Sequence, residues 1–241
     1  TAMPAVSKVF GAPALTLTDP ASTSTGAFMY TSSNTAVATI TGNEVTIVGA
    51  GTAVISANQT ATAAYSSGSV TFNLTVTKAS RTLTGFSASI DKVYGSSAFV
   101  LPTITRSAGT GSIIYTSSNS SVAIVNGTTI IIVGAGTATI NANIAADANY
   151  GSATTSTLLT VSKAPRTISG LATTITKTVG DPSFDLSTTL SAGTGTITYA
   201  SSNTSVATVS GTTISIVGAG TATITASVAS NANYQAATAY S

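Results

Sequence analysis

The fold is decided by one stretch of the chain, Tyr115-Thr-Ser-Ser-Asn119, which continues through Val122-Ala-Ile-Val125 to Ile130-Ile-Ile-Val-Gly-Ala-Gly-Thr-Ala138. The same pattern occurs three times in the 241 residues, so the chain is a tandem repeat. The three copies run from Tyr30 to Ala53, from Tyr115 to Ala138 and from Tyr199 to Ala222.

Each copy holds two short apolar runs separated by a small polar turn, which is the pattern of a β-hairpin. The turn residues are Gly42-Asn43, Asn126-Gly127 and Ser210-Gly211. Each hairpin is followed by Val-Gly-Ala-Gly-Thr-Ala, in which two glycines let the backbone turn and re-enter a sheet. In the second copy the re-entering strand is expected at Thr137–Ala142.

The spacing of the repeat predicts three domains. A turn glycine recurs at Gly11, Gly95 and Gly180, at intervals of 84 and 85 residues. We therefore expect modules at 1–79, 80–164 and 165–241, called repeats 1, 2 and 3 below. Each repeat contains about seven short apolar runs and no helical apolar stripe, which predicts an all-β fold of two packed sheets.

The links between repeats are short, and they favour an elongated rod. Lys78-Ala-Ser-Arg81 and Lys163-Ala-Pro-Arg166 connect the last strand of one repeat to the next, without a flexible Gly-Ser tract. At about 3.3 Å per residue, strands of up to about ten residues predict a rod of roughly 100 to 120 Å.

The recurring motifs resemble those of the bacterial immunoglobulin-like repeats of the group 2 type. The resemblance rests on Tyr-x-Ser-Ser-Asn-x-x-Val-Ala, on Val-Gly-Ala-Gly-Thr-Ala and on Ala-Asn-Tyr, and it covers nearly the whole chain. It implies three tandem immunoglobulin-like β-sandwiches in an extracellular setting, because such repeats occur in bacterial surface adhesins and tailed-phage virion proteins. Repeat 1 departs from the pattern with Thr62-Ala-Ala-Tyr65 in place of the Asn-Tyr element.

Composition excludes several classes of function. The chain has no histidine and no cysteine, which removes disulfides, thiolate zinc sites and Ser-His-Asp triads. Only 6% of residues are charged and the net charge is +2, so we expect no nucleic-acid binding. No apolar run is long enough to span a bilayer, so we expect no membrane insertion. We assign no catalytic, cofactor-binding or metal residue, and we expect neither enzymatic activity nor a cofactor.

The acids and lysines leave few candidates for chemistry. Asp181 and Asp185 are close enough to share a calcium ion, but repeats 1 and 2 have no acid there, so a solvated turn is favoured. Five lysines recur at strand ends or junctions and are interpreted as solubilising or edge-protecting charges rather than as partners of a nucleophile. They are Lys8, Lys92, Lys177, Lys78 and Lys163.

Arginines and tyrosines are given structural roles. Arg81 and Arg166 are expected to clasp loops of the adjoining module. One set of tyrosines precedes the last strand and is interpreted as a tyrosine corner, whose hydroxyl bonds to nearby backbone. These residues are Tyr65, Tyr150 and Tyr234. A second set is expected to pack in the core or between the sheets, and consists of Tyr30, Tyr115 and Tyr199.

The sequence stops at Ser241, before any counterpart of Leu159 and Val161 in the last strand of repeat 2. Two interpretations remain open: the polypeptide continues, or another chain donates the missing strand.

Three functions fit these observations. The first is a structural rod that forms or decorates the exterior of a virion, fibre or cell envelope, with other structural subunits as partners in a homo- or hetero-oligomer and with weak surface adhesion. The second is a cell-surface adhesin that binds a host glycan or protein through loops such as 19–26 or 145–148. The third is a non-catalytic spacer or binding module beside an enzyme in a longer chain. The sequence shows no export or anchoring signal, which favours the virion among the exterior settings.

Overall fold

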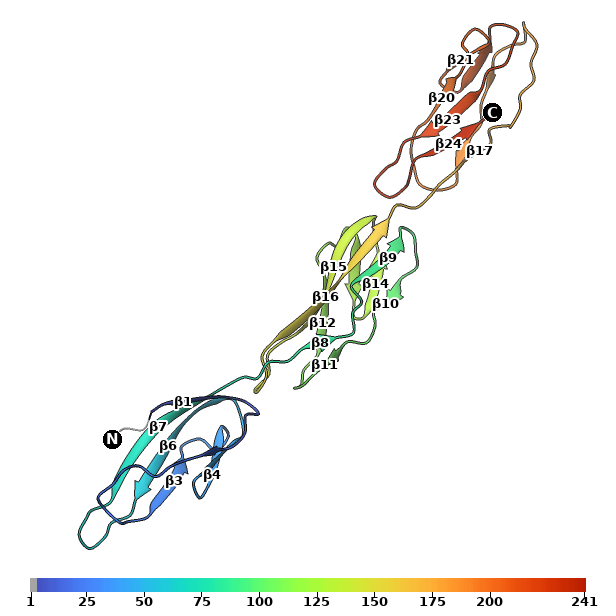
Figure 1. The fold of residues 1–241 in the computed structure, drawn as a ribbon. Coiled ribbons are helices and arrows are strands. Elements are labelled where there is room, and N and C mark those ends of the chain that lie inside the picture. Colours follow the sequence, from blue (N-terminus) through green and yellow to red (C-terminus); the bar gives the residue numbers. More distant parts are fainter. Residues whose placement is uncertain (1–3) are drawn as a thin grey trace. The chain divides into compact units, whose positions relative to one another are not determined.

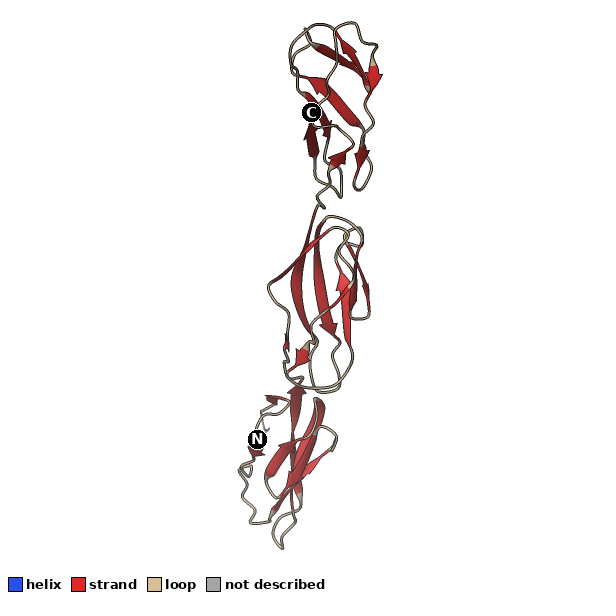
Figure 2. Cartoon of the chain, turned by 90° about the vertical axis from the view of Figure 1, so that its right-hand side faces the viewer, coloured by secondary structure: helices blue, strands red, loops and turns tan. Residues whose placement is uncertain are grey.

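The structure is a computed structural model, and it describes residues 4–241. In that part of the chain all regular structure is β-strand, and Figure 2 shows strands joined by loops. The expected all-β fold is therefore confirmed. No helix of the described part is long and apolar enough to cross a membrane.

Repeat 1 folds into two sheets. The larger has the strand order β1-β7-β6-β3 and the smaller β2-β5-β4, and every neighbouring pair is antiparallel except β1 and β7. The strands are β1 (Val6–Val9), β2 (Leu15–Thr16), β3 (Phe28–Ser32), β4 (Ala38–Thr41), β5 (Glu44–Ile47), β6 (Gly51–Gln59) and β7 (Gly68–Thr77).

The core of repeat 1 lies between these sheets, as expected of an immunoglobulin-like sandwich. Alternate residues of β6 and β7 are buried, and Ile55 of β6 and Leu74 of β7 meet the buried Val45 of β5 in one apolar cluster. Tyr30 packs against this cluster, and Tyr115 and Tyr199 pack against the cores of their own repeats. This confirms the packing role predicted for the three tyrosines.

Repeat 2 keeps the same two sheets, ordered β12-β15-β16-β9 and β10-β14-β13, and adds a small pair, β8-β11. As in repeat 1, the first strand of the larger sheet runs parallel to the last. The strands are β8 (Leu83–Thr84), β9 (Ser89–Val93), β10 (Phe99–Val100), β11 (Thr105–Arg106), β12 (Ile113–Ser117), β13 (Ala123–Asn126), β14 (Thr129–Ile132), β15 (Gly136–Ile144) and β16 (Ala153–Ser162).

Repeat 3 has the sheets β20-β23-β24 and β18-β22-β21 and the pair β17-β19. The strands β20, β23 and β24 lie side by side in Figure 1. The bounds are β17 (Ile168–Ser169), β18 (Phe184–Asp185), β19 (Thr189–Leu190), β20 (Ile197–Ser201), β21 (Ala207–Ser210), β22 (Thr213–Ile216), β23 (Ile224–Val228) and β24 (Ala237–Tyr240).

The predicted hairpins and re-entry turns are present. Strands β4 and β5 pair from Ala38↔Ile47 to Thr41↔Glu44, so the loop between them is Gly42-Asn43. The chain re-enters the larger sheet at Gly51, which has φ 148°. A Cβ atom added to this glycine would lie 2.8 Å from Val37 Cγ2. A side chain there is opposed by both backbone strain and the buried valine.

The Ser-Ser-Asn motif forms the turn that links the two sheets. Asn34 Oδ1 accepts a hydrogen bond from the N–H of Ala36 at 3.1 Å, and Ser33 Oγ accepts one from the N–H of Val54 at 2.8 Å. The same bonds recur in repeats 2 and 3. In each copy the asparagine therefore satisfies an N–H of its own turn, as in an Asx turn, and the serine satisfies a backbone N–H 21 positions later in the chain.

The described chain divides into two compact units. One contains the described residues up to Phe86 together with Pro102–Tyr115 and Asn141–Thr155, and the other contains Ser87–Leu101, Thr116–Ile140 and Ser156–Ser241. Each unit includes one of the two junctions between repeats, which are described separately below. The boundaries 1–79, 80–164 and 165–241 stay predictions.

Candidate functional site

A junction in the first unit joins the link after β7 to the loop that precedes β16. The backbone of Ala79 forms a parallel bridge with Tyr150: the Ala79 N–H donates to the Asn149 carbonyl at 2.9 Å, and the Gly151 N–H donates to the Ala79 carbonyl at 2.9 Å. We call the contacts among Phe10, Ala50, Ala79, Asn149 and Tyr150 the first junction.

The second junction, in the other unit, repeats this backbone pairing. The Ala164 N–H donates to the Asn233 carbonyl at 2.9 Å, and the Gln235 N–H donates to the Ala164 carbonyl at 2.9 Å. Its members occupy the equivalent positions Tyr94, Ala135, Ala164, Asn233 and Tyr234.

An asparagine side chain completes each junction. Asn149 Oδ1 accepts a hydrogen bond from the N–H of Ala50 at 2.9 Å, and Asn233 Oδ1 accepts one from the N–H of Ala135 at 2.9 Å. Both alanines lie in the Gly-Ala-Gly turn. A Cβ on Gly49 would lie 2.5 Å from the Ala36 carbonyl oxygen, so this turn also has no room for a larger residue.

An aromatic pair accompanies the asparagine. The Phe10 and Tyr150 rings meet edge to face at 5.5 Å between centroids, and the Tyr94 and Tyr234 rings do so at 5.4 Å. Such pairs contribute about 0.5 to 1.5 kcal/mol beyond the area that they bury.

The predicted tyrosine corner is not formed. Within residues 4–241 no hydrogen bond from the hydroxyl of Tyr65, Tyr150 or Tyr234 to the backbone is present. Instead, the backbone carbonyl of each tyrosine accepts a bond from the residue three positions earlier, and the rings of Tyr150 and Tyr234 face the junction. These tyrosines therefore share the sequence position of a tyrosine-corner residue, but they do not make its bond from the hydroxyl to the backbone.

Arg81 organises the loops next to the first junction, and its side chain is fully buried. Its Nη1 donates to the Thr110 carbonyl at 3.0 Å and to Asp147 Oδ2 at 3.1 Å, and its Nη2 donates to the Ala145 carbonyl. These loops belong to repeat 2, which contains Arg81 itself. The expectation that the arginine clasps the adjoining module is thus corrected: it binds loops of the repeat that it leads into.

Arg166 makes the corresponding contacts in repeat 3 without a carboxylate. Its Nε donates to the Gln235 carbonyl at 2.8 Å, its Nη1 to the Thr194 carbonyl at 2.9 Å, and its Nη2 to the Ala229 carbonyl. Asn231 stands where repeat 2 has Asp147, and its Nδ2 also donates to the Thr194 carbonyl, at 3.0 Å. The Arg166 guanidinium therefore binds three backbone carbonyls, whereas that of Arg81 binds two carbonyls and the Asp147 carboxylate.

Asp147 is surrounded by donors. Its Oδ2 accepts from the Thr110 N–H at 2.9 Å, and its Oδ1 accepts from the N–H groups of Asn149 and Tyr150 at 3.0 and 2.8 Å. These bonds, led by the one from Thr110, and the Arg81 charge lower the pKa of Asp147 to about 2, although partial desolvation opposes the shift. The carboxylate orders the loop that presents Asn149 and Tyr150.

Repeat 1 has neither the carboxylate nor the junction asparagine at the equivalent positions. Thr62-Ala-Ala-Tyr65 keeps the backbone turn, with the Thr62 N–H donating to the Tyr65 carbonyl at 2.9 Å. However, Ala64 stands where the other repeats have Asn149 and Asn233, and Tyr65 is 49% exposed.

The recurrent lysines lie at edges and junctions. Lys92 is on the edge strand β9 with its Nζ 4.7 Å from the centroid of the Phe99 ring, and Lys177 stands over Phe184 in the same way at 4.9 Å. Lys78 donates to the Asp147 carbonyl, next to the first junction.

Asp181 and Asp185 serve different segments. Asp181 Oδ2 accepts from the Thr178 N–H at 2.9 Å and caps the turn at Gly180, whereas Asp185 Oδ1 accepts from Thr213 Oγ1 at 2.6 Å. In the described residues no group of three or more His, Cys, Asp or Glu is placed to hold a metal ion.

A separate polar contact lies on repeat 1. The Tyr30 hydroxyl donates to Asp19 Oδ1 at 2.8 Å, beside a cavity of about 400 Å³ lined by Phe28, Met29 and Asn43. Desolvation and then the Asp19 hydrogen bond and charge raise the pKa of Tyr30 to about 12. This phenol remains neutral at physiological pH.

Sequence reasoning missed the role of Asn149 and Asn233. The sequence did contain a signal, which is the departure of repeat 1 from the Asn-Tyr pattern. Ala64 replaces the asparagine in that repeat, and the neighbouring Tyr65 pairs with no aromatic ring in the described structure. Phe10 and Tyr94 also fall at one repeat position, but an aromatic residue before a glycine does not by itself indicate its partner.

No family model and no curated protein matches the chain. Among solved structures, Drosophila N-cadherin EC1-3 is similar at 8% identity and TM-score 0.39, over 99% of this chain and 97% of that one. Four N-terminal immunoglobulin domains of Dscam1 give 13% identity and TM-score 0.29, over 98% and 70%. Surface layer protein SbsC, domains 4–9, gives 13% and 0.28, over 88% and 38%.

Proposed function

We propose that the chain is a non-enzymatic structural array of immunoglobulin-like modules on the exterior of a virion, fibre or cell envelope. The observation that carries this proposal is the repetition of one junction: a backbone bridge, an asparagine bond and an aromatic pair recur at equivalent positions. Such contacts favour a fixed geometry between successive repeats, which is what a structural array needs.

The use of the polar side chains also supports a non-enzymatic role. Asp19, Asp147, Asp181 and Asp185 accept internal hydrogen bonds, and the buried arginines bind loop carbonyls. Hydrogen bonds of this kind hold the loops and turns in which these side chains lie, which gives the charged groups a structural role. The partners that we propose are other structural subunits of the same assembly.

The exterior array is tested by small-angle scattering and by binding assays on the purified chain. We expect a maximum dimension of roughly 100 to 120 Å, from strands that rise about 3.3 Å per residue. We also expect no saturable binding to a glycan array or to intact cells. A compact particle would contradict the array, and turnover of a substrate would contradict the non-enzymatic role.

An adhesin is the second candidate, and the cavity beside Asp19 and Tyr30 favours it. This cavity has a carboxylate, aromatic rings and the exposed side chain of Met29 in one place, and its volume is within the range of ligand sites. It also borders the loop 19–26. By contrast, the loop 145–148 is held by Arg81 and Lys78, which opposes a recognition role there. Saturable glycan binding that is lost in Asp19→Asn and Tyr30→Phe would favour the adhesin.

A further inference from the structure

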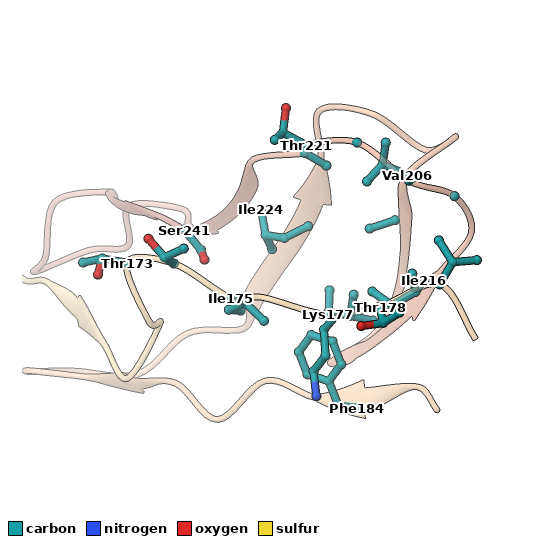
Figure 3. A pocket seen from close by; sticks show the side chains of 18 residues that line it. Thr173, Ile175, Lys177, Thr178, Phe184, Val206, Ile216, Thr221, Ile224 and Ser241 are labelled. Carbon is teal, nitrogen blue, oxygen red and sulfur yellow. The ribbon is translucent and has the colours of Figure 1, made fainter. Parts of the chain in front are cut away.

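Repeat 3 contains a groove, lined by apolar side chains together with threonines and turn backbone, at a surface that a paired strand covers in repeats 1 and 2. Its volume is about 610 Å³. Ile224 of β23 and Ile175 of the segment opposite lie on its two sides, Val206 and Phe184 line it further along, and Ser241 stands at one end (Figure 3).

In repeat 1 the corresponding space is filled by the second half of β7. Leu74 and Val76 are buried there, and their strand pairs on one side with β6 and on the other with β1. In repeat 2, Leu159 and Val161 of β16 are buried in the same way, and β16 pairs with β9. Two repeats of the same molecule therefore show what covers this surface.

The segments that line the groove form shorter strands or none, compared with the equivalent segments of repeats 1 and 2. A valine that lines it is also more exposed than its equivalents. β6 and β15 begin at Gly51 and Gly136, but β23 begins only at Ile224, so 220–223 form no strand. The segment 174–178, equivalent to β9, forms no strand either. Val206 is half-buried, whereas Val37 and Val122 are buried.

Backbone pairing at the end of β24 fixes the register of a strand in the groove. The Ser241 N–H donates to the Ile224 carbonyl at 3.0 Å, and the Ile224 N–H donates to the Ser241 carbonyl at 3.3 Å. In repeat 1, Ile55 and Phe72 are partners at this position, followed by Ala53↔Leu74 and Gly51↔Val76.

By equivalence, a strand in line with β24 would place one apolar side chain between Ala222 and Ile175. It would place the next one between Gly220 and Lys177. Leucine and valine fill these two positions in repeats 1 and 2.

The adjacent turn carries the other half of a junction. Ala219 occupies the position of Ala50 and Ala135, whose N–H groups bind the junction asparagines. Val179 occupies the position of Phe10 and Tyr94 and is 56% exposed.

We infer that this end of repeat 3 receives a further repeat of the same class, through a β-strand in line with β24 that fills the groove and leads into that repeat. The incoming repeat carries an asparagine for the Ala219 N–H and an Asn-Tyr element like Asn149-Tyr150. Repeat 1 of a second copy of this chain is a poorer match for this site, because it has Ala64 where the asparagine is needed. The inference rests on the groove and holds whether or not the array is exterior.

The strand is tested by extending the chain after Ser241 with Leu158–Lys163 of its own sequence, which continues the register of β16. We expect a rise of several °C in the melting temperature of repeat 3 and at least tenfold slower amide exchange at 174–178 and 220–223. The matched control carries serine at the positions of Leu159 and Val161 and should show neither effect. If the apolar extension leaves melting and exchange unchanged, the strand site is wrong.

The added repeat is tested by extending the chain with Leu158–Ser241, which supplies a fourth repeat. Exchange of the Ala219 amide should slow, and asparagine-to-alanine substitution in the added copy of Asn233 should reverse this. An unchanged Ala219 amide alongside a filled groove would overturn the docking of a repeat and retain the strand. A free peptide of Thr157–Lys163 provides a second measurement if an extended chain aggregates: saturable shifts confined to groove residues support the strand site, and their absence at millimolar peptide contradicts it.

Discussion

Asn149 and Ala50 are 99 positions apart in the sequence, yet the Asn149 side-chain oxygen accepts a hydrogen bond from the Ala50 N–H at 2.9 Å. Asn233 and Ala135 repeat this relationship in the other unit, 98 positions apart. The recurrence of one long-range bond indicates that the Gly-Ala-Gly turns of repeats 1 and 2 each have two roles. Each turn starts a strand of its own repeat, and it presents a donor to the next.

Replacing Asn149 or Asn233 with alanine, as repeat 1 has at Ala64, should loosen the junction that the asparagine completes. Loss of one hydrogen bond costs about 1 kcal/mol, so the Ala50 or Ala135 amide should exchange about fivefold faster. Amide exchange by NMR measures this, and Asn73→Ala on the exposed face of β7 is the control. Equal exchange in the variant and the parent would show that the bond contributes nothing to the junction.

Replacing Arg81 with methionine should destabilise repeat 2 strongly. The change removes three hydrogen bonds of the buried guanidinium, to the carbonyls of Thr110 and Ala145 and to Asp147, and each such bond contributes about 1 kcal/mol. Urea unfolding should show a loss of about 2 to 4 kcal/mol in the transition of that repeat. Arg106→Ala, at an exposed arginine of β11, should change it by less than about 0.5 kcal/mol. A similar small loss in both variants would contradict the structural role of Arg81.

Asp147 should make repeat 2 sensitive to acid. Its pKa is lowered from 3.8 to about 2, so its contribution to stability is present above about pH 4 and is lost as the pH falls through 2. The urea midpoint of the parent chain should therefore fall between pH 4 and pH 2, and Asp147→Asn should have a shallower dependence.

The control for this acid dependence is Asp91→Asn, at an exposed acid of β9, which should retain the parent slope. If Asp147→Asn retained the parent slope as well, another carboxylate would have to account for the acid sensitivity.

Gly109 should tolerate no side chain. It has φ +78°, and a Cβ would lie 2.5 Å from Asp147 Oδ2 and 2.8 Å from Arg81 Nη1. Gly95→Ala separates backbone strain from steric overlap, because Gly95 has φ +86° but no atom within 4 Å of an added Cβ. This substitution should cost about 1 to 2 kcal/mol of stability. Gly109→Ala should cost more than that in urea unfolding. Gly68→Ala, which has neither problem, should leave stability nearly unchanged; equal costs at Gly95 and Gly109 would indicate that the loop moves aside.

The sequence by itself determined the all-β class, the repeats, the hairpins at Gly42, Gly127 and Gly211, and the re-entry turns. These features depend on local alternation and on glycines that take positive φ, both of which can be read within a few residues. The sequence also located the position in repeat 3 that corresponds to the apolar half of the last strand of repeat 2. Alignment with Leu159 and Val161 was sufficient for that.

Only the tertiary structure decided which groups meet. The buried Arg81, its partner Asp147 and the contact of Asn149 with Ala50 join segments separated by about 65 to 100 positions, and no local pattern specifies such pairs. The same holds for Tyr150, where position suggested a hydroxyl bond but packing against Phe10 set the ring. The local alternation of a strand selects its buried face, whereas the partner on that face is selected by how the sheets and turns pack, because side-chain contacts depend on atoms brought together only in the folded chain.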